Sequence, residues 1–140
     1  MRELKRFTSE DSALLLIDHQ VGTMSWVNSI SLEEMKRHAV MLAKTAKILN
    51  IPTVLTSSME KYAQGPLMDE LKDNLPVEFE ACIKRLGIVN AMDDDIFAAA
   101  VTATGRKRII IAWLTNDVCT VYPTLMRQIV QEIVMPTLQG

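Results

Sequence analysis

The sequence predicts an α/β protein in which a mainly parallel, Rossmann-like sheet lies between two layers of helices. Strand-like and helix-like segments alternate along the chain, and the strand-like segments are short, continuous apolar runs. Such runs are typical of parallel strands that are covered by helices on both faces. Strands that alternate with helices also require right-handed crossover connections. No repeat, low-complexity tract or long Gly/Ser linker divides the 140 residues, so residues 1–140 are expected to form one domain.

Four segments are predicted strands. The clearest is S-A-L-L-L-I at 12–17. The others are residues 51–56, the weaker segment 79–83, and residues 108–113 with I-I-I-A-W. Residues 132–138 offer a poor fifth strand at best, because Pro136 interrupts them.

The longest predicted helix covers residues 31–50. Ser31 and Glu34 form a capping box at its start, in which each side chain satisfies an unpaired backbone N–H. Apolar residues then fall on one face at helical spacing: Met35, Ala39, Leu42, Ala46 and Leu49. Shorter helices are predicted over residues 67–74, from Asp93 to a capping Gly105, and over 119–134.

Composition excludes several classes of function. The formal net charge is −2 and the basic cluster 106–108 is short, so no nucleic-acid surface is expected. No apolar run approaches the length of a membrane span, and the first ten residues lack a signal-peptide pattern. Two cysteines do not make a disulfide framework. We therefore expect a cytoplasmic protein with no membrane partner.

Chemically useful side chains follow three of the predicted strands, at the sheet edge where ligands bind in parallel sheets. Asp18 ends the first strand, Lys84 and Arg85 end the third, and Cys119 follows the fourth after a short turn. Cys119 also opens a predicted helix, and a helix N-terminus favours a thiolate. A neighbouring cation would favour it further, and Asp18 could take up the thiol proton.

Each of these residues also has an ordinary structural explanation. A lone cysteine after a strand is commonly a small buried hydrophobe. An aspartate at a strand end is commonly a turn residue, and Lys84–Arg85 could be an exposed pair. The residues alone leave both interpretations open.

Two segments carry a resemblance to a known family. A-L-L-L-I-D-H-Q at 13–20 and I-I-I-A-W-L-T-N-D-V-C-T-V-Y-P at 109–123 resemble the two signatures of the isochorismatase-like cysteine hydrolases, and the segments at 51–58 and 84–91 stand in the expected order between them. The resemblance covers about residues 10–130 and implies that family's α/β/α fold.

The resemblance also implies roles for individual residues. It makes Cys119 the nucleophile, Asp18 the general base and Arg85 the third member of a triad, with Lys84 as the alternative cation. It implies a cis peptide between Leu114 and Thr115, and an oxyanion site at the backbone N–H groups of Val118 and Cys119. We further expect the substrate pocket to include Gln20, Trp26, Trp113 and Tyr122.

The sequence departs from the family in three respects. Trp113 stands where many members have glycine. The zinc-binding Asp-x-His of one branch is absent after the second strand, so we expect no metal and no cofactor. Family members usually continue beyond the cysteine helix with two more strands and further helices, so the fold is expected to be truncated at its C-terminal edge.

Two functions remain open at this point. The first is hydrolysis of a C–N bond in a small amide-like substrate through a cysteine nucleophile. The alternative is a catalytically inactive or truncated family member that acts as an oligomerisation or interaction module. A Rossmann-type nucleotide site is disfavoured, because no G-x-G-x-x-G or P-loop is present. The expected partners are a small-molecule substrate and further copies of the same chain, since a bare sheet edge invites pairing.

Overall fold

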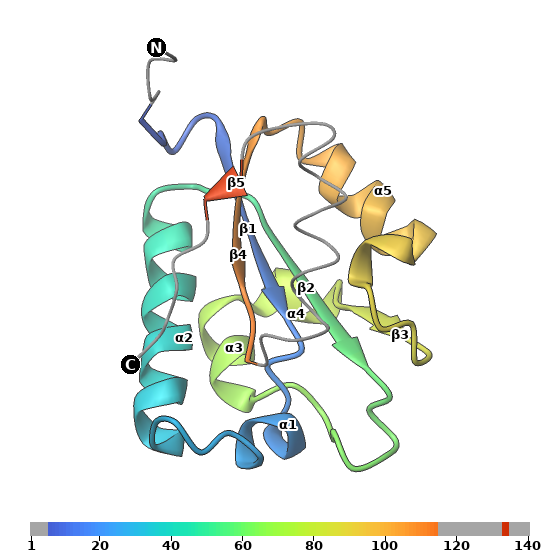
Figure 1. Ribbon diagram of the computed structural model, residues 1–140. Coiled ribbons are helices and arrows are strands. Elements are labelled where there is room, and N and C mark those ends of the chain that lie inside the picture. Colours follow the sequence, from blue (N-terminus) through green and yellow to red (C-terminus); the bar gives the residue numbers. More distant parts are fainter. Residues whose placement is uncertain (1–5, 115–132, 135–140) are drawn as a thin grey trace.

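The computed structural model describes residues 6–114 and 133–134 and shows a three-layer α/β/α arrangement (Figure 1). Within these residues a parallel five-stranded sheet has the order β3-β2-β1-β4-β5. Its strands are β1 Ser12–Ile17, β2 Thr53–Ser58, β3 Ile83–Arg85, β4 Arg108–Ala112 and β5 Ile133–Val134. β1 pairs with β2 on one side and with β4 on the other, so it is the central strand of the sheet.

Helices cover both faces of this sheet. They are α1 Val21–Ser25, α2 Leu32–Ile48, α3 Asp69–Asn74, α4 Pro76–Glu80 and α5 Asp95–Ala103, with a 3₁₀ turn at Ala91–Asp93. Figure 1 shows α2 and α3 on one side of the sheet and α5 on the other. The three-layer fold predicted from the sequence is therefore correct.

The apolar residues of β1 divide between the two layers, because successive side chains of a strand point to opposite faces. Leu14 and Leu16 join a buried cluster with the apolar face of α2. Leu15 and Ile17 join a second cluster with Phe97 of α5. All six residues of β1 are buried, which explains why the strand reads as a continuous apolar run rather than an alternation.

Two predicted boundaries and one predicted core position differ from the structure. The expected strand at 79–83 is displaced, because Pro76 starts α4 and the strand begins only at Ile83; proline at the first helical position has a suitable φ and needs no N–H donor. Residues 133–134 pair with β4 as β5, within the segment 132–138 predicted as a poor fifth strand, so the helix predicted over 119–134 does not extend to Val134. The sequence predicts Leu49 on the buried face of the long helix, but Leu49 is the C-cap residue of α2 and is 49% exposed.

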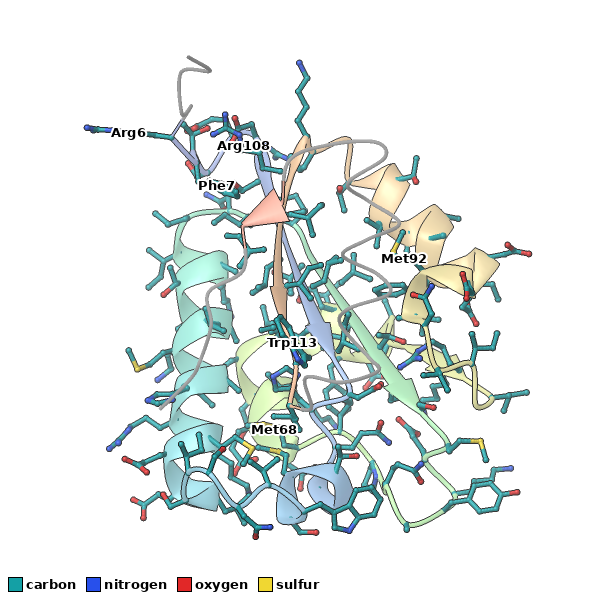
Figure 2. The ribbon with its side chains drawn as sticks, viewed as in Figure 1. Arg6, Phe7, Met68, Met92, Arg108 and Trp113 are labelled. Carbon is teal, nitrogen blue, oxygen red and sulfur yellow. The ribbon has the colours of Figure 1, made fainter. Side chains whose placement is uncertain are left out.

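The amino end of β4 is closed by packing with the N-terminal segment. The Arg108 guanidinium lies 5.2 Å from the centre of the Phe7 ring and 3.5 Å from Asp11. Figure 2 shows Arg108 and Phe7 at this end and Trp113 toward the other end of β4. The carboxyl edge is therefore the one that remains for chemistry, as in other open parallel sheets.

The capping box of α2 is confirmed and makes a stability prediction. The Glu34 backbone N–H donates to Ser31 Oγ at 3.2 Å, and the Ser31 backbone N–H reaches Glu34 at 3.4 Å. Ser31→Ala should lower the free energy of unfolding by about 1 kcal/mol in urea titrations, because the helix start loses an acceptor. The control Ser29→Ala, in the exposed loop before the helix, should change it by less than about 0.5 kcal/mol. Equal effects of the two variants would contradict the capping role.

Candidate active site

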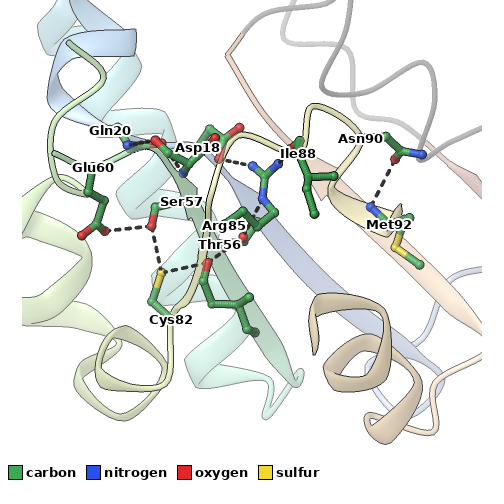
Figure 3. Close-up of polar contacts among 12 residues, drawn as sticks. Asp18, Gln20, Thr56, Ser57, Glu60, Cys82, Arg85, Ile88, Asn90 and Met92 are labelled. Carbon is green, nitrogen blue, oxygen red and sulfur yellow. Dashed lines mark hydrogen bonds and ion pairs between the residues drawn. The ribbon is translucent and has the colours of Figure 1, made fainter. Parts of the chain in front are cut away.

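The carboxyl ends of β1 and β3 bring Asp18 and Arg85 into direct contact (Figure 3). Arg85 Nη2 donates to Asp18 Oδ1, and the side chain of Arg85 is fully buried. Lys84, the alternative cation, instead pairs with Glu60 at 3.1 Å and is 67% exposed. Of the two cations left open by the sequence, Arg85 is the one that the structure places beside Asp18.

Two further contacts hold the Arg85 guanidinium in place. Arg85 Nε donates to Thr56 Oγ1 at 3.0 Å, and Nη1 donates to the carbonyl of Ile88. Gly87 has a φ of +89°, a conformation that glycine adopts without strain, and it lies in the turn that carries Ile88 back over the guanidinium. Each of the three guanidinium nitrogens therefore has its own acceptor, an arrangement that a lysine ammonium cannot reproduce.

Asp18 is presented by a sharp turn rather than by the strand itself. Its φ is +57°, in the left-handed region where aspartate is tolerated better than most residues. Its N–H donates to the carbonyl of Thr56 at 2.9 Å, and its own carbonyl accepts from the Gln20 N–H at 2.7 Å. These backbone bonds fix the turn that directs the carboxylate toward Arg85.

Gln20, which the sequence predicts to line the substrate pocket, has its polar side-chain atoms engaged by backbone. Its side chain is completely buried. The amide nitrogen donates to the carbonyls of Ser58 and Gly65, and the amide oxygen accepts from the Ser58 N–H. The adjoining Gly22 packs so closely that a Cβ there would lie 1.8 Å from the Ala63 carbonyl oxygen. Gln20 therefore holds the loop after β2 against α1, and its polar atoms are occupied by backbone.

The two tryptophans occupy different environments. Trp113 lines a small cavity of about 50 Å³ together with Leu114, His19 and apolar residues of α2. Trp26 is 54% exposed and does not line this cavity. Of these two predicted pocket residues, Trp113 borders a cavity formed by described residues.

The remaining predicted site residues, Thr115, Val118, Cys119 and Tyr122, lie outside the described residues, as does the Leu114–Thr115 peptide bond. Leu114 itself follows β4, which pairs with β1 along its length. Sequence reasoning missed Thr56, because its burial and its contact with Arg85 follow from the pairing of β2 with β1 and β3 and leave no local signal in the sequence.

No family model matches the chain. It is 42% identical over 120 residues to the probable hydrolase YcaC of Escherichia coli, an alignment that covers 86% of this chain and 57% of that protein. The structure of that protein superimposes with a TM-score of 0.89. YcaC of Pseudomonas aeruginosa gives a TM-score of 0.90 at 39% identity, over 96% of this chain and 66% of that one.

An isochorismatase of Pseudomonas putida shares the fold at 14% identity, with a TM-score of 0.77 over 96% of this chain and 72% of that one. The chain belongs to the isochorismatase-like superfamily. Resemblance to this superfamily, inferred from four short motifs, is thereby confirmed. The chain spans about three fifths of the length of the E. coli relative, so the activity of the whole protein is treated below as a proposal.

A second polar cluster of this isochorismatase-like chain includes Ser57, the neighbour of Thr56 on β2, whose side chain points to the opposite face of the sheet from Thr56 (Figure 3). Cys82 Sγ lies 3.7 Å from Ser57 Oγ, which donates to Glu60 at 2.8 Å, and Glu60 pairs with Lys84. The cluster borders a pocket of about 250 Å³. Burial raises the pKa of the Cys82 thiol above its ordinary value. These groups satisfy one another, and the thiol is held in its protonated, unreactive form.

Neither a metal site nor a membrane span is found in the described part of the chain. No three His, Cys, Asp or Glu side chains of residues 6–114 and 133–134 converge as metal ligands would. No helix in these ranges is both long enough and apolar enough to cross a bilayer.

His19, between Asp18 and Gln20, predicts a pH dependence of stability. Burial lowers the pKa of His19 from 6.5 to about 4, with the Ile17 carbonyl acting more weakly in the opposite direction. Its Nδ1 has no partner among the described residues. Between pH 6.5 and 4 the unfolded chain therefore binds a proton at His19 that the folded chain does not. The contribution of the neutral His19 to the free energy of unfolding is complete above pH 6.5 and is lost as the pH falls toward 4.

The loss of unfolding free energy caused by protonation of His19 in the unfolded chain should approach about 3 kcal/mol near pH 4. It is measured as the difference in unfolding free energy between the natural chain and His19→Asn at each pH. That difference should shift in favour of the variant as the solution is acidified. Parallel stability curves for the two proteins would contradict the buried, neutral imidazole.

Proposed function

We propose that the chain carries the catalytic centre of a hydrolase that cleaves the C–N bond of small amide-like substrates, with Cys119 as nucleophile. The observation that supports this most strongly is the buried Asp18–Arg85 pair at the carboxyl edge of β1. β1 pairs directly with β4, and Cys119 follows β4 closely in the sequence. A carboxylate–arginine pair beside a thiol supplies the base, the balancing cation and the nucleophile that acyl transfer requires.

The proposed reaction has two halves. Asp18 accepts the thiol proton as the Cys119 sulfur attacks the substrate carbonyl carbon, and the backbone N–H groups of Val118 and Cys119 bind the oxyanion. The tetrahedral intermediate collapses to a thioester, and the leaving amine takes the proton from Asp18. A water molecule, deprotonated by Asp18, then attacks the thioester and releases the carboxylic acid and the thiol.

Among the described residues, Arg85 donates a hydrogen bond to Oδ1 of Asp18 and not to Oδ2. We therefore assign Oδ2 to the proton transfers. The charge of Arg85 balances the carboxylate in a site where an isolated charge would be costly to bury. Trp113 and the cavity beside it are assigned to the apolar part of the substrate. No step in this scheme requires a metal or a cofactor.

The relatives support the reaction class and the assembly. YcaC of P. aeruginosa has been crystallised with covalent acrylamide, a small amide that is also an electrophile. E. coli YcaC is described as an octameric hydrolase of unknown specificity. We accordingly propose that this chain also forms a homo-oligomer, and a cytoplasmic location remains a prediction from the sequence.

Thiol reactivity tests the proposal directly. Iodoacetamide labelling of the two cysteines, followed by mass spectrometry between pH 5 and 9, should show Cys119 reacting at least about tenfold faster than Cys82 at pH 7, with a midpoint below the free-thiol value of about 8.5. Cys82 should be slow, because burial raises its pKa. Cys82→Ser should leave the fast reaction unchanged, and Cys119→Ser should abolish it. Equal, slow rates at both thiols would instead favour the inactive, oligomerising family member.

A further inference from the structure

The Arg85 side chain reaches Asp18 only by crossing β2. Arg85 ends β3, Asp18 follows β1, and β2 lies between these two strands. Thr56 lies opposite Ile17 of β1 on one side and opposite Ile83 of β3 on the other. It is fully buried, and its hydroxyl meets the guanidinium midway along this path.

The hydrogen bond that the Thr56 hydroxyl donates fixes the side on which it accepts one from Arg85. It donates its own proton to the Ile83 carbonyl at 2.8 Å. Its lone pairs then face Arg85 Nε, which donates to it at 3.0 Å. The hydroxyl group is therefore an oriented acceptor, and it determines the plane in which the guanidinium lies.

This anchor explains why Arg85 contacts Asp18 through one nitrogen. Arginine and carboxylate commonly pair through two parallel hydrogen bonds, which engage both carboxylate oxygens. With Nε bound to Thr56 and Nη1 bound to Ile88, only Nη2 contacts Asp18, and it contacts Oδ1. Without the Thr56 anchor, the guanidinium would be able to turn and occupy Oδ2 as well.

We infer that Thr56 is a positioning residue, whose hydroxyl holds Arg85 in the one-oxygen contact that leaves Asp18 Oδ2 to accept the thiol proton. This inference rests on the proposed function, because the value of a free Oδ2 depends on Cys119 as the nucleophile. It adds to that proposal a residue on β2 that contacts neither the substrate nor the thiol.

The test compares three substitutions on β2. Thr56→Val removes the hydroxyl and keeps the shape, and Thr56→Ser keeps the hydroxyl. Thr53→Val is the matched control, because the Thr53 hydroxyl donates to the Ile51 carbonyl just before β2, whereas Arg85 bonds Thr56, Ile88 and Asp18. Each protein is labelled at Cys119 with iodoacetamide across the pH range, and the Arg85 Nε–H signal is followed by NMR with ¹⁵N-arginine.

Thr56→Val should slow Cys119 alkylation at pH 7 by about tenfold and move its pH midpoint upward, since misplacement of a catalytic group by about 1 Å can cost on the order of 100-fold in rate. Its Arg85 Nε–H should also exchange faster with water. Thr56→Ser and Thr53→Val should remain within about twofold of the natural chain in rate. A valine variant that only lost stability would keep the natural pH midpoint.

The possible failures are distinguishable. A natural chain in which Cys119 is no more reactive than Cys82 overturns both the proposed function and this inference. A reactive natural chain with an unchanged rate and midpoint in Thr56→Val overturns the inference alone, as does a Thr56→Ser variant that behaves like the valine one. If the valine variant does not fold, Thr56→Ala takes its place against Thr56→Ser, with the same expected contrast and the same contradicting result.

Discussion

The buried ion pair between Asp18 and Arg85 is the interaction on which the rest of the site depends. Removing one partner of such a pair leaves an uncompensated charge, which typically costs about 3–5 kcal/mol. The surrounding structure is arranged to satisfy both groups. The left-handed turn at Asp18 aims the carboxylate, and the Thr56 hydroxyl and the Ile88 carbonyl take the other donors of the guanidinium.

The same pair links three strands at the carboxyl edge of the sheet. Arg85 comes from β3, Thr56 from β2 and Asp18 from the end of β1, so the side-chain contacts hold only in the observed strand order. Gln20 adds a second tie, because its amide holds the loop after β2 by three backbone contacts. The proposed chemistry would thus lie at strand ends, and the loop after β2 is held by a Gln20 amide that bonds backbone through both of its ends.

The two cysteines illustrate how environment separates two identical groups. Cys82 lies in a half-buried cluster in which Ser57, Glu60 and Lys84 satisfy one another, and burial favours its neutral form. Cys119 is proposed to lie at a helix start near the Asp18–Arg85 pair, where a thiolate is favoured. The family resemblance singles out Cys119 by its place in the second signature, and the local contacts of Cys82 add a physical reason why the other thiol is the less reactive one.

Much of this architecture could be predicted from the sequence, and the exceptions have physical causes. The apolar run of β1 and the Ser31–Glu34 capping box are local signals, and both are confirmed. The start of β3 was misplaced because Phe79 continues an apolar pattern that periodicity cannot separate from a short helix. The role of Thr56 and the burial of Gln20 depend on which strands are neighbours and in what register. No local pattern carries that information.

The account is tested most directly by a double-mutant cycle on the ion pair. Asp18→Asn keeps a side chain that tolerates the left-handed turn, and Arg85→Met keeps much of the buried stem. Unfolding is followed in urea at one fixed protein concentration, since assembly would otherwise shift the apparent stability. Each single variant should lose about 3 kcal/mol, and the double variant little more, which corresponds to a coupling of about 2 kcal/mol or more. Losses that add to within about 0.5 kcal/mol would contradict the pair as the constraint that organises the site.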